Sequence, residues 1–259
     1  MSGVPQIFDT NLRRLRRGRA ASGFGAFSFL AAAARDEIGE RLAVVPQSFD
    51  RAVWFGAVAP PPIKSLSWIL GDSAAEFVAP GGIVFDEDAV PFGAQSLDCY
   101  VSILTLHALN DLPGALAQIR RCLKPNGFFT AALLGGGTLH ELRLALAEAE
   151  IELEGGLSPR VAPFVDVRDG GALLQRAGFA LPVADVDTLT VRYEHPIKLL
   201  KDLRGMGETN ILTERRRTFL KRSVLVRAAE IYTKKFAGPD GRVPATFDIV
   251  YLTGWAPGP

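Results

Sequence analysis

The feature that most constrains the fold is a long apolar run, LDCYVSILTL, at residues 97–106. A run of this length that is nearly all apolar predicts a strand buried on both faces, as in the middle of a parallel sheet. Shorter apolar runs alternate with segments of helical periodicity on either side of it. This alternation predicts an α/β fold with a doubly wound, Rossmann-like parallel sheet.

The predicted elements follow one another along the whole chain. Strands are expected at 51–55, 67–70, 82–85, 97–106, 128–134, 183–193 and 246–255, and helices at 10–20, 29–44, 113–123, 138–153, 166–177 and 213–236. The last two strands are separated by helices, so they can pair antiparallel at one edge of the sheet. We therefore expect a single domain over residues 1–259, with N-terminal helices in residues 1–45 and a helical insertion at 195–236.

Composition and spacing exclude several classes of protein. The net charge of +1 favours neither nucleic acid nor a membrane surface as a partner, and no apolar run is long enough to span a bilayer. Cys99 and Cys122 lie far apart in apolar segments, as reduced core residues do. His107, His140 and His195 have no metal-binding spacing, so no metal site is expected. We expect a cytoplasmic protein.

Two segments are locally basic. Five arginines lie between Arg13 and Arg19, opposed only by Asp9. We expect them to form a solvated helix face, with the N-cap near Asp9; a docking patch for an acidic partner and a mitochondrial-type presequence are the alternatives. The second basic segment runs from Arg215 to Arg222, and it is either a solvated face or a docking surface for a protein.

Residues 86–129 resemble the class I methyltransferases that use S-adenosylmethionine (SAM). An acidic residue is followed by Pro-Phe, then by SLD at the fourth strand and LKPNG before the fifth, which is the usual order in that superfamily. Other segments resemble the methyltransferase-like assembly-factor family of respiratory complex I and, more distantly, the malonyl-carrier-protein methyltransferase of biotin synthesis. These segments are LLGGGTLHELR (133–143), EGGLSPRVAPF (154–164), DLRGMGETN (202–210) and GRVPATFDIVYLTGW (241–255).

The resemblance implies SAM as the cofactor and a subunit of a respiratory complex as the partner. One mitochondrial branch of the assembly-factor family is an arginine hydroxylase that acts on a complex I subunit. Three functions are therefore open: a SAM-dependent methyltransferase with an atypical loop, a protein arginine hydroxylase, and a non-catalytic relative that keeps the partner-binding surface. His107 follows the fourth strand, near where substrates lie in doubly wound sheets, and has either a catalytic or a structural role.

The segment AVWFGAVAPPP (52–62) lies where the superfamily has an acidic residue followed by a GxGxG loop. Trp54 falls at the acidic position, and Gly56, Val58 and Pro60 fall at the three glycines, so only Gly56 is retained. Glycines there let backbone N–H groups approach the ligand, and a proline has no N–H to donate. Only eleven residues separate the first two predicted strands, so the helix between them has a turn or two at most.

Acidic residues complete the expected cofactor site. Asp72 comes slightly after the second strand and is either a ribose ligand or the N-cap of a short helix over 73–79. Asp86, with Glu87 beside it, stands where the superfamily often holds the adenine amino group; the alternative is a solvated acidic loop. The sequence therefore predicts a methyltransferase-fold protein with a degenerate SAM-binding loop, whose C-terminal half still recognises a protein partner.

Overall fold

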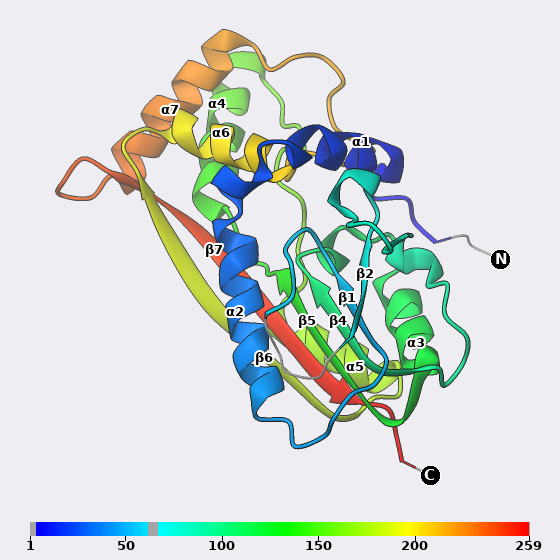
Figure 1. The fold of residues 1–259 in the computed structure, drawn as a ribbon. Coiled ribbons are helices and arrows are strands. Elements are labelled where there is room, and N and C mark those ends of the chain that lie inside the picture. Colours follow the sequence, from blue (N-terminus) through cyan, green and yellow to red (C-terminus); the bar gives the residue numbers. More distant parts are fainter. Residues whose placement is uncertain (1–3, 62–66, 259) are drawn as a thin grey trace.

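The computed structural model describes residues 4–61 and 67–258 and arranges them around one seven-stranded sheet (Figure 1). Across the sheet the order is β3 (Ile83–Val84), β2 (Trp68–Asp72), β1 (Ala52–Phe55), β4 (Leu97–Ile103), β5 (Leu123–Leu134), β7 (Val243–Trp255) and β6 (Ala180–Tyr193). The first five of these strands run parallel, and β7 pairs antiparallel with both β5 and β6. The predicted doubly wound sheet and its antiparallel edge are confirmed.

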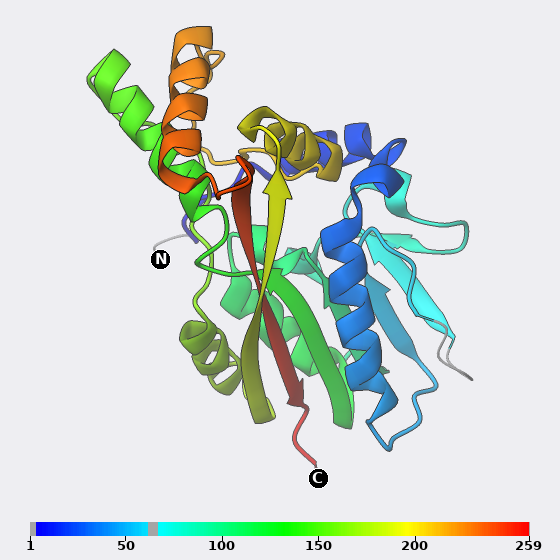
Figure 2. The same cartoon turned by 90° about the vertical axis from the view of Figure 1, so that its left-hand side faces the viewer.

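Helices cover both faces of the sheet because each has one apolar stripe (Figure 2). α2 (Phe29–Ala43) lies on one face, where its Ala34 and Ile38 pack with Trp54. α3 (Leu112–Cys122) and α5 (Val167–Arg176) lie on the other face. The buried residues of α3 recur at the three- and four-residue spacing of a helix face, from Leu112 through Leu116 to Cys122.

A third group of helices packs beyond one end of the sheet, against the extended halves of β6 and β7 (Figure 2). It consists of α4 (His140–Glu154), α6 (Pro196–Met206) and α7 (Arg222–Phe236). α6 and α7 stand where the insertion was expected, but residues 213–221 are not helical. Leu212 forms an isolated bridge with Phe8 instead, and turns and bends follow it until α7 begins at Arg222.

α1 (Thr10–Ala21) lies across the end of the sheet at which the parallel strands finish (Figure 1). Asp9 is its N-cap, as predicted, and accepts a hydrogen bond from the Leu12 N–H at 3.0 Å. The expectation of a fully solvated arginine face is wrong for Arg13 and Arg17, which are 7% and 3% exposed. They lie one turn apart, so both project from the same side of α1 toward the sheet.

Three expectations from the sequence concern the cysteines, membrane-spanning segments and metal sites. Cys99 and Cys122 are free and buried, and burial raises the pKa of both thiols. Within the described ranges, no helix has the length and apolarity needed to cross a membrane. Among the same residues, no group of three or more His, Cys, Asp and Glu side chains is arranged to hold a metal ion, and the absence of a metal site stays a prediction.

Candidate functional site

The strand order changes direction between β1 and β4, and in doubly wound sheets a ligand crevice opens at the carboxyl ends of the strands at such a point. We call this place the β1/β4 crevice. The residues expected to bind a cofactor or to take part in catalysis all lie at the last residue of a parallel strand or on the segment that follows one. Their contacts show which of them face the crevice.

Gly56, the retained glycine, is required by its backbone. Its φ is +138°, and a Cβ on it would lie 2.8 Å from the Ile103 carbonyl oxygen at the end of β4. Its N–H donates to the Gly71 carbonyl at 2.9 Å, so the group is not available to a ligand. Trp54, at the expected acidic position, donates from Nε1 to the Val58 carbonyl at 2.7 Å and fastens the loop to β1.

The connection that follows Gly56 has no helix in its described part, residues 57–61. A Cβ on Gly39 of α2 would lie 3.1 Å from Cγ of Pro61, so the proline ring packs against that helix. Residues 62–66, the remaining room for the expected turn or two of helix, lie outside the described residues. A helix N-terminus, which would offer N–H groups to an anion, is thus not formed by residues 57–61.

Asp72 is the last residue of β2, so the expectation that it comes late is wrong. It is also not a helix N-cap, because the short helix that follows is a single turn, Ala75–Phe77, capped by Ala74. The carboxylate is fully buried. Oδ2 accepts from Arg17 Nη2 at 2.6 Å, and Oδ1 accepts from the Ala74 N–H at 2.9 Å. Asp72 therefore stands at the strand end where a ribose ligand would lie, with its oxygens already hydrogen-bonded.

The neighbours Asp86 and Glu87 take separate roles. Asp86 is at the surface and pairs with Arg14 of α1. Glu87 is 1% exposed and accepts hydrogen bonds from the Tyr100 and Thr105 hydroxyls, so a solvated acidic loop is wrong for this residue. Burial raises the pKa of Glu87 to about 7, against the opposing effect of these hydroxyls. Glu87 is a core carboxyl, and only Asp86 remains near solvent.

His107 lies beyond β4, and its side chain is 2% exposed. Its Nδ1 faces the Leu134 N–H at 3.5 Å, and its Nε2 lies 3.4 Å from Oε2 of Glu208. A backbone N–H can only donate, which assigns the proton of the neutral ring to Nε2, where it faces the carboxylate. The edge of the ring contacts Phe164, with ring centres 5.7 Å apart. This geometry positions Glu208.

Glu208 lies in the segment DLRGMGETN, which resembles the assembly-factor family, but no catalytic motif or spacing pairs it with His107. It is 101 residues from His107 in the chain, and only the fold brings the two together. Its Oε1 also lies 3.7 Å from Arg17 Nη1. Burial alone would raise the pKa of Glu208, but His107 and the charges of Arg13 and Arg17 outweigh it and lower the pKa to about 2. Glu208 is therefore an anion throughout the physiological range.

The arginines of α1 and these carboxylates form one group, which we call the α1 charge cluster: Arg13, Arg17, Asp72 and Glu208. The first three are buried, and the side chain of Glu208 is 26% exposed. Arg13 donates from Nη2 to the Thr105 carbonyl at 2.8 Å, just beyond β4. Burial and the nearby charge of Arg17 lower the pKa of Arg13. Two cations and two anions balance, which is the condition under which buried charges are tolerated.

Two members of the α1 charge cluster, Arg17 and Glu208, line a cavity at the β1/β4 crevice. The cavity left there measures about 30 Å³ and is lined by residues such as Arg17, Ala57, Leu104 and Glu208. That is roughly the volume of one water molecule, whereas sites for small molecules and cofactors span about 300–1,000 Å³. The described residues that line this cavity therefore leave no room in it for SAM.

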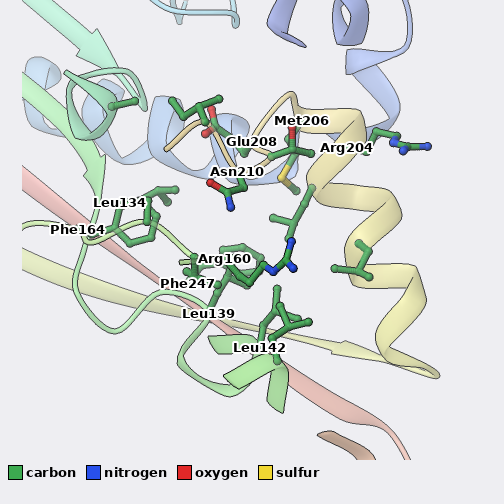
Figure 3. Close-up of a pocket in the computed structure, with 18 of the residues that line it drawn as sticks. Leu134, Leu139, Leu142, Arg160, Phe164, Arg204, Met206, Glu208, Asn210 and Phe247 are labelled. Atoms are coloured by element: carbon green, nitrogen blue, oxygen red, sulfur yellow. The ribbon is translucent and has the colours of Figure 1, made fainter. Parts of the chain in front are cut away.

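A much larger cavity, about 510 Å³, lies next to the crevice beneath α6 (Figure 3). We call it the α6 cavity. Its walls are mainly apolar and include Leu134, Leu139, Leu142, Phe164, Met206 and Phe247. In Figure 3, Glu208 and Asn210 lie on the side opposite Leu139 and Leu142, and Arg160 extends between them. Glu208 is the one acidic residue among the described residues that line it.

Comparisons with known proteins show which family this arrangement resembles. Residues 72–131 match the profile described as "Methyltransferase domain". The human protein named arginine-hydroxylase NDUFAF5, mitochondrial, is 37% identical over 265 residues, which cover 96% of this chain and 76% of that protein. The zebrafish protein of the same name is 44% identical over 175 residues, which cover 68% of this chain and 54% of that one. The latter match thus spans about half of that relative.

Two further similarities confirm the predicted superfamily. A malonyl-acyl-carrier-protein O-methyltransferase from Halorhodospira halophila is 36% identical over 179 residues, covering 69% of this chain and 59% of that protein. The crystal structure of a SAM-dependent methyltransferase from Thermotoga maritima has a TM-score of 0.52 at 14% identity, covering 94% of this chain and 99% of that one. The second similarity shows a common fold.

Proposed function

The chain belongs to the family of the arginine-hydroxylase NDUFAF5 and has the class I methyltransferase fold, and from these two facts we propose a function. The protein is an assembly factor of respiratory complex I that binds an arginine side chain of a protein subunit in the α6 cavity. It does so without binding SAM in the usual crevice. One observation carries this proposal: the cavity at the β1/β4 crevice measures about 30 Å³, whereas the neighbouring α6 cavity measures about 510 Å³.

The loss of ordinary SAM binding follows from the groups that would hold the cofactor. The glycine loop is degenerate, with Val58 and Pro60 at two of its three glycine positions. The carboxylate of Asp72 is paired with Arg17, and that of Asp86 with Arg14. SAM would have to displace α1 to reach either carboxylate. We therefore propose that this protein is a pseudoenzyme with respect to SAM-dependent methyl transfer.

The segments that resemble the assembly-factor family support the α6 cavity as the working site. Leu139 and Leu142 come from residues 133–143, Arg160 and Phe164 from 154–164, Met206 and Glu208 from 202–210, and Phe247 from 241–255. Four separate segments thus converge on one cavity. This convergence gives a physical reason why these segments keep the family pattern while the cofactor loop does not.

Glu208 gives the cavity a carboxylate for an arginine side chain, the group that the relatives' name specifies. The cations Arg160, Lys201 and Arg204 also line the cavity, so the guanidinium would have to lie at Glu208. The methylene groups of an arginine would lie against the apolar walls, and its guanidinium would meet the carboxylate of Glu208. That carboxylate has about four acceptor positions, of which His107 and Arg17 use part. A guanidinium matches a carboxylate in planar, paired hydrogen bonds.

The expected compartment stays the cytoplasm as a prediction, although the relatives' names place those proteins in mitochondria.

The test is a titration of the protein with two peptides that differ at one position. The first carries a central arginine, and the second carries citrulline, which has the same shape without the charge. Chemical shifts of cavity residues are followed by NMR. We expect the arginine peptide to bind at least about tenfold more tightly, since a hydrogen bond to a charged group contributes about 1.5–3 kcal/mol.

The Glu208→Gln variant should remove this preference, because it leaves the shape of the site and deletes the anion. Glu152→Gln is the matched control, because Glu152 is an exposed glutamate on α4 and does not line the α6 cavity. Equal binding of the arginine and citrulline peptides by the natural protein would contradict the proposal. So would a preference that persists in a folded Glu208→Gln protein.

A further inference from the structure

A second hollow, about 500 Å³, opens on the surface beside the α6 cavity. It lies between α1 and the irregular segment that precedes α7. Its charged lining consists of five arginines and one acidic residue: Arg16, Arg160, Arg215, Arg216, Arg217 and Asp9. We call it the arginine groove. The function proposed above does not use it.

Three arginines of the groove have acidic partners and two do not. Arg215 lies 3.1 Å from Asp9, Arg216 pairs with Glu154, and Arg160 pairs with Glu150. The remaining two are Arg16 and Arg217. Within residues 4–61 and 67–258, neither of them lies within ion-pair distance of an acidic side chain.

Arg16 donates to the Asn210 carbonyl, and among the described residues the charge of Asp9 acts on it without forming an ion pair. Burial and the nearby charge of Arg215 lower the pKa of Arg16. An added carboxylate would relieve this repulsion and could bind a guanidinium in a bidentate manner. The groove therefore favours an anionic partner.

An aromatic side chain lies at the edge of the same groove. Phe219 is 100% exposed, and the neighbouring Leu220 and Leu12 also line the groove. Phenylalanine is usually buried in a folded chain, and aromatic residues next to arginines are enriched in the binding centres of protein interfaces. Phe219 thus adds an apolar contact to the charged one.

The groove and the α6 cavity are adjacent, because Arg160 and Asn210 line both. A chain that lies in the groove would therefore lie close to the cavity. We propose that the arginine groove docks an acidic segment of the protein partner, with Phe219 packing on an apolar residue of that segment. Docking would place a neighbouring arginine at the α6 cavity; this last step rests on the function proposed above.

The acids around the groove favour a peptide over a nucleic acid. Asp9 lines the groove itself, and Glu150 and Glu154 pair with its Arg160 and Arg216. They would repel a continuous line of phosphates, which needs a basic stripe. Separate carboxylates on a peptide can each meet an arginine and avoid these acids.

The experiment measures fluorescence anisotropy with three labelled probes on the full chain. The first is a ten-residue peptide with four Glu and Asp residues around a Leu-Phe pair and no arginine. The second has Gln and Asn in place of the acids, and the third is an oligothymidylate of ten nucleotides. We expect the acidic peptide to bind below 1 mM and at least about tenfold more tightly than the neutral peptide, with affinity falling as salt rises.

Variants assign the binding to the groove. Arg217→Gln alters an exposed residue without an acidic partner in the described structure, and should weaken the acidic peptide about fivefold. Arg16→Gln together with Arg217→Gln should weaken it about tenfold or more, and Phe219→Ala about fivefold. Arg19→Gln is the matched control for Arg16→Gln, since Arg19 also lies on α1 and is exposed but does not line the groove.

Three results would overturn the inference. They are equal binding of the acidic and neutral peptides, tighter binding of the oligothymidylate with the same dependence on Arg217, and no binding of the acidic peptide at 1 mM. Because this peptide has no arginine, Glu208→Gln should leave its affinity unchanged. If adding an arginine to it gains nothing while Arg217 and Phe219 still matter, the groove stands and the proposed function of the cavity fails.

Discussion

Replacing Arg17 by methionine removes the cation that closes the β1/β4 crevice. Nη2 of Arg17 lies 2.6 Å from Oδ2 of Asp72, and the two side chains are 4% and 0% exposed. Deleting one partner of a buried ion pair leaves the other charge without compensation, which costs about 3–5 kcal/mol. The guanidinium also lies 5.0 Å from the centre of the Phe77 ring, which adds about 0.5–1 kcal/mol. We therefore expect the free energy of unfolding to fall by about 4 kcal/mol.

A loss of that size is a large part of the roughly 5–15 kcal/mol that stabilises a typical domain. For a chain of this length it corresponds to a fall in Tm of roughly 8–16 °C. The assay is denaturant unfolding followed by circular dichroism. Arg14→Met is the matched control on the same helix: Arg14 and Asp86 are 45% and 27% exposed, and such surface pairs contribute about 0–1 kcal/mol.

A double-mutant cycle with Asp72→Asn isolates the pair. Asparagine can still accept the Ala74 N–H through its side-chain oxygen, so this change removes mainly the charge. The double variant should be more stable than the sum of the two single effects predicts, by about 2 kcal/mol. Our account of the crevice is refuted if Arg17→Met costs no more than Arg14→Met, or if the two single effects simply add.

Two other predictions concern residues of the expected cofactor site. The pKa of Glu87 is about 7 in the fold against 4.5 in the unfolded chain, so the neutral carboxyl stabilises the fold fully below pH 4.5 and this contribution is lost as pH rises through 7. Between pH 4.5 and 8.5 the natural protein should lose about 3 kcal/mol of unfolding free energy relative to Glu87→Gln, and parallel pH profiles would contradict this. Gly56→Ala should cost about 1–3 kcal/mol because its φ is +138° and Ile103 is close, whereas Gly23→Ala, with nothing within 4 Å of its added Cβ, should cost less than about 1 kcal/mol. Equal effects of these two alanine variants in denaturant unfolding would argue against strain at Gly56.

The sheet could be predicted from the sequence because each strand and helix is marked by the polarity and spacing of residues that are neighbours in the chain. Residues 97–106 are nearly all apolar, and β4, which lies within them, is buried between β1 and β5. The buried positions of α3 repeat at helical spacing, and Pro113 and Asp111 mark its start. The altered loop after β1 is likewise visible in the sequence, because Val58 and Pro60 differ from glycine in chemistry and not only in context.

The site could not be predicted in the same way, because it depends on contacts between distant segments. The arginines of α1 have the composition of a solvated face, and only the position of α1 over the strand ends turns Arg13 and Arg17 inward. The same holds for Glu208, which meets His107 and Arg17 through the return of the chain after α6. Whether Asp72 ends β2 or follows it depends on its pairing with Val84, which is again a tertiary contact.

The most direct test of the central claim is a calorimetric titration of the purified chain with SAM and with S-adenosylhomocysteine. Mass spectrometry first establishes whether either molecule has co-purified. The account predicts no binding heat up to millimolar ligand, because Arg17 lines the small cavity at the crevice and Asp72 is already hydrogen-bonded. Micromolar binding of either ligand would contradict it, and would show that the loop of residues 56–61 serves a SAM-dependent methyltransferase after all.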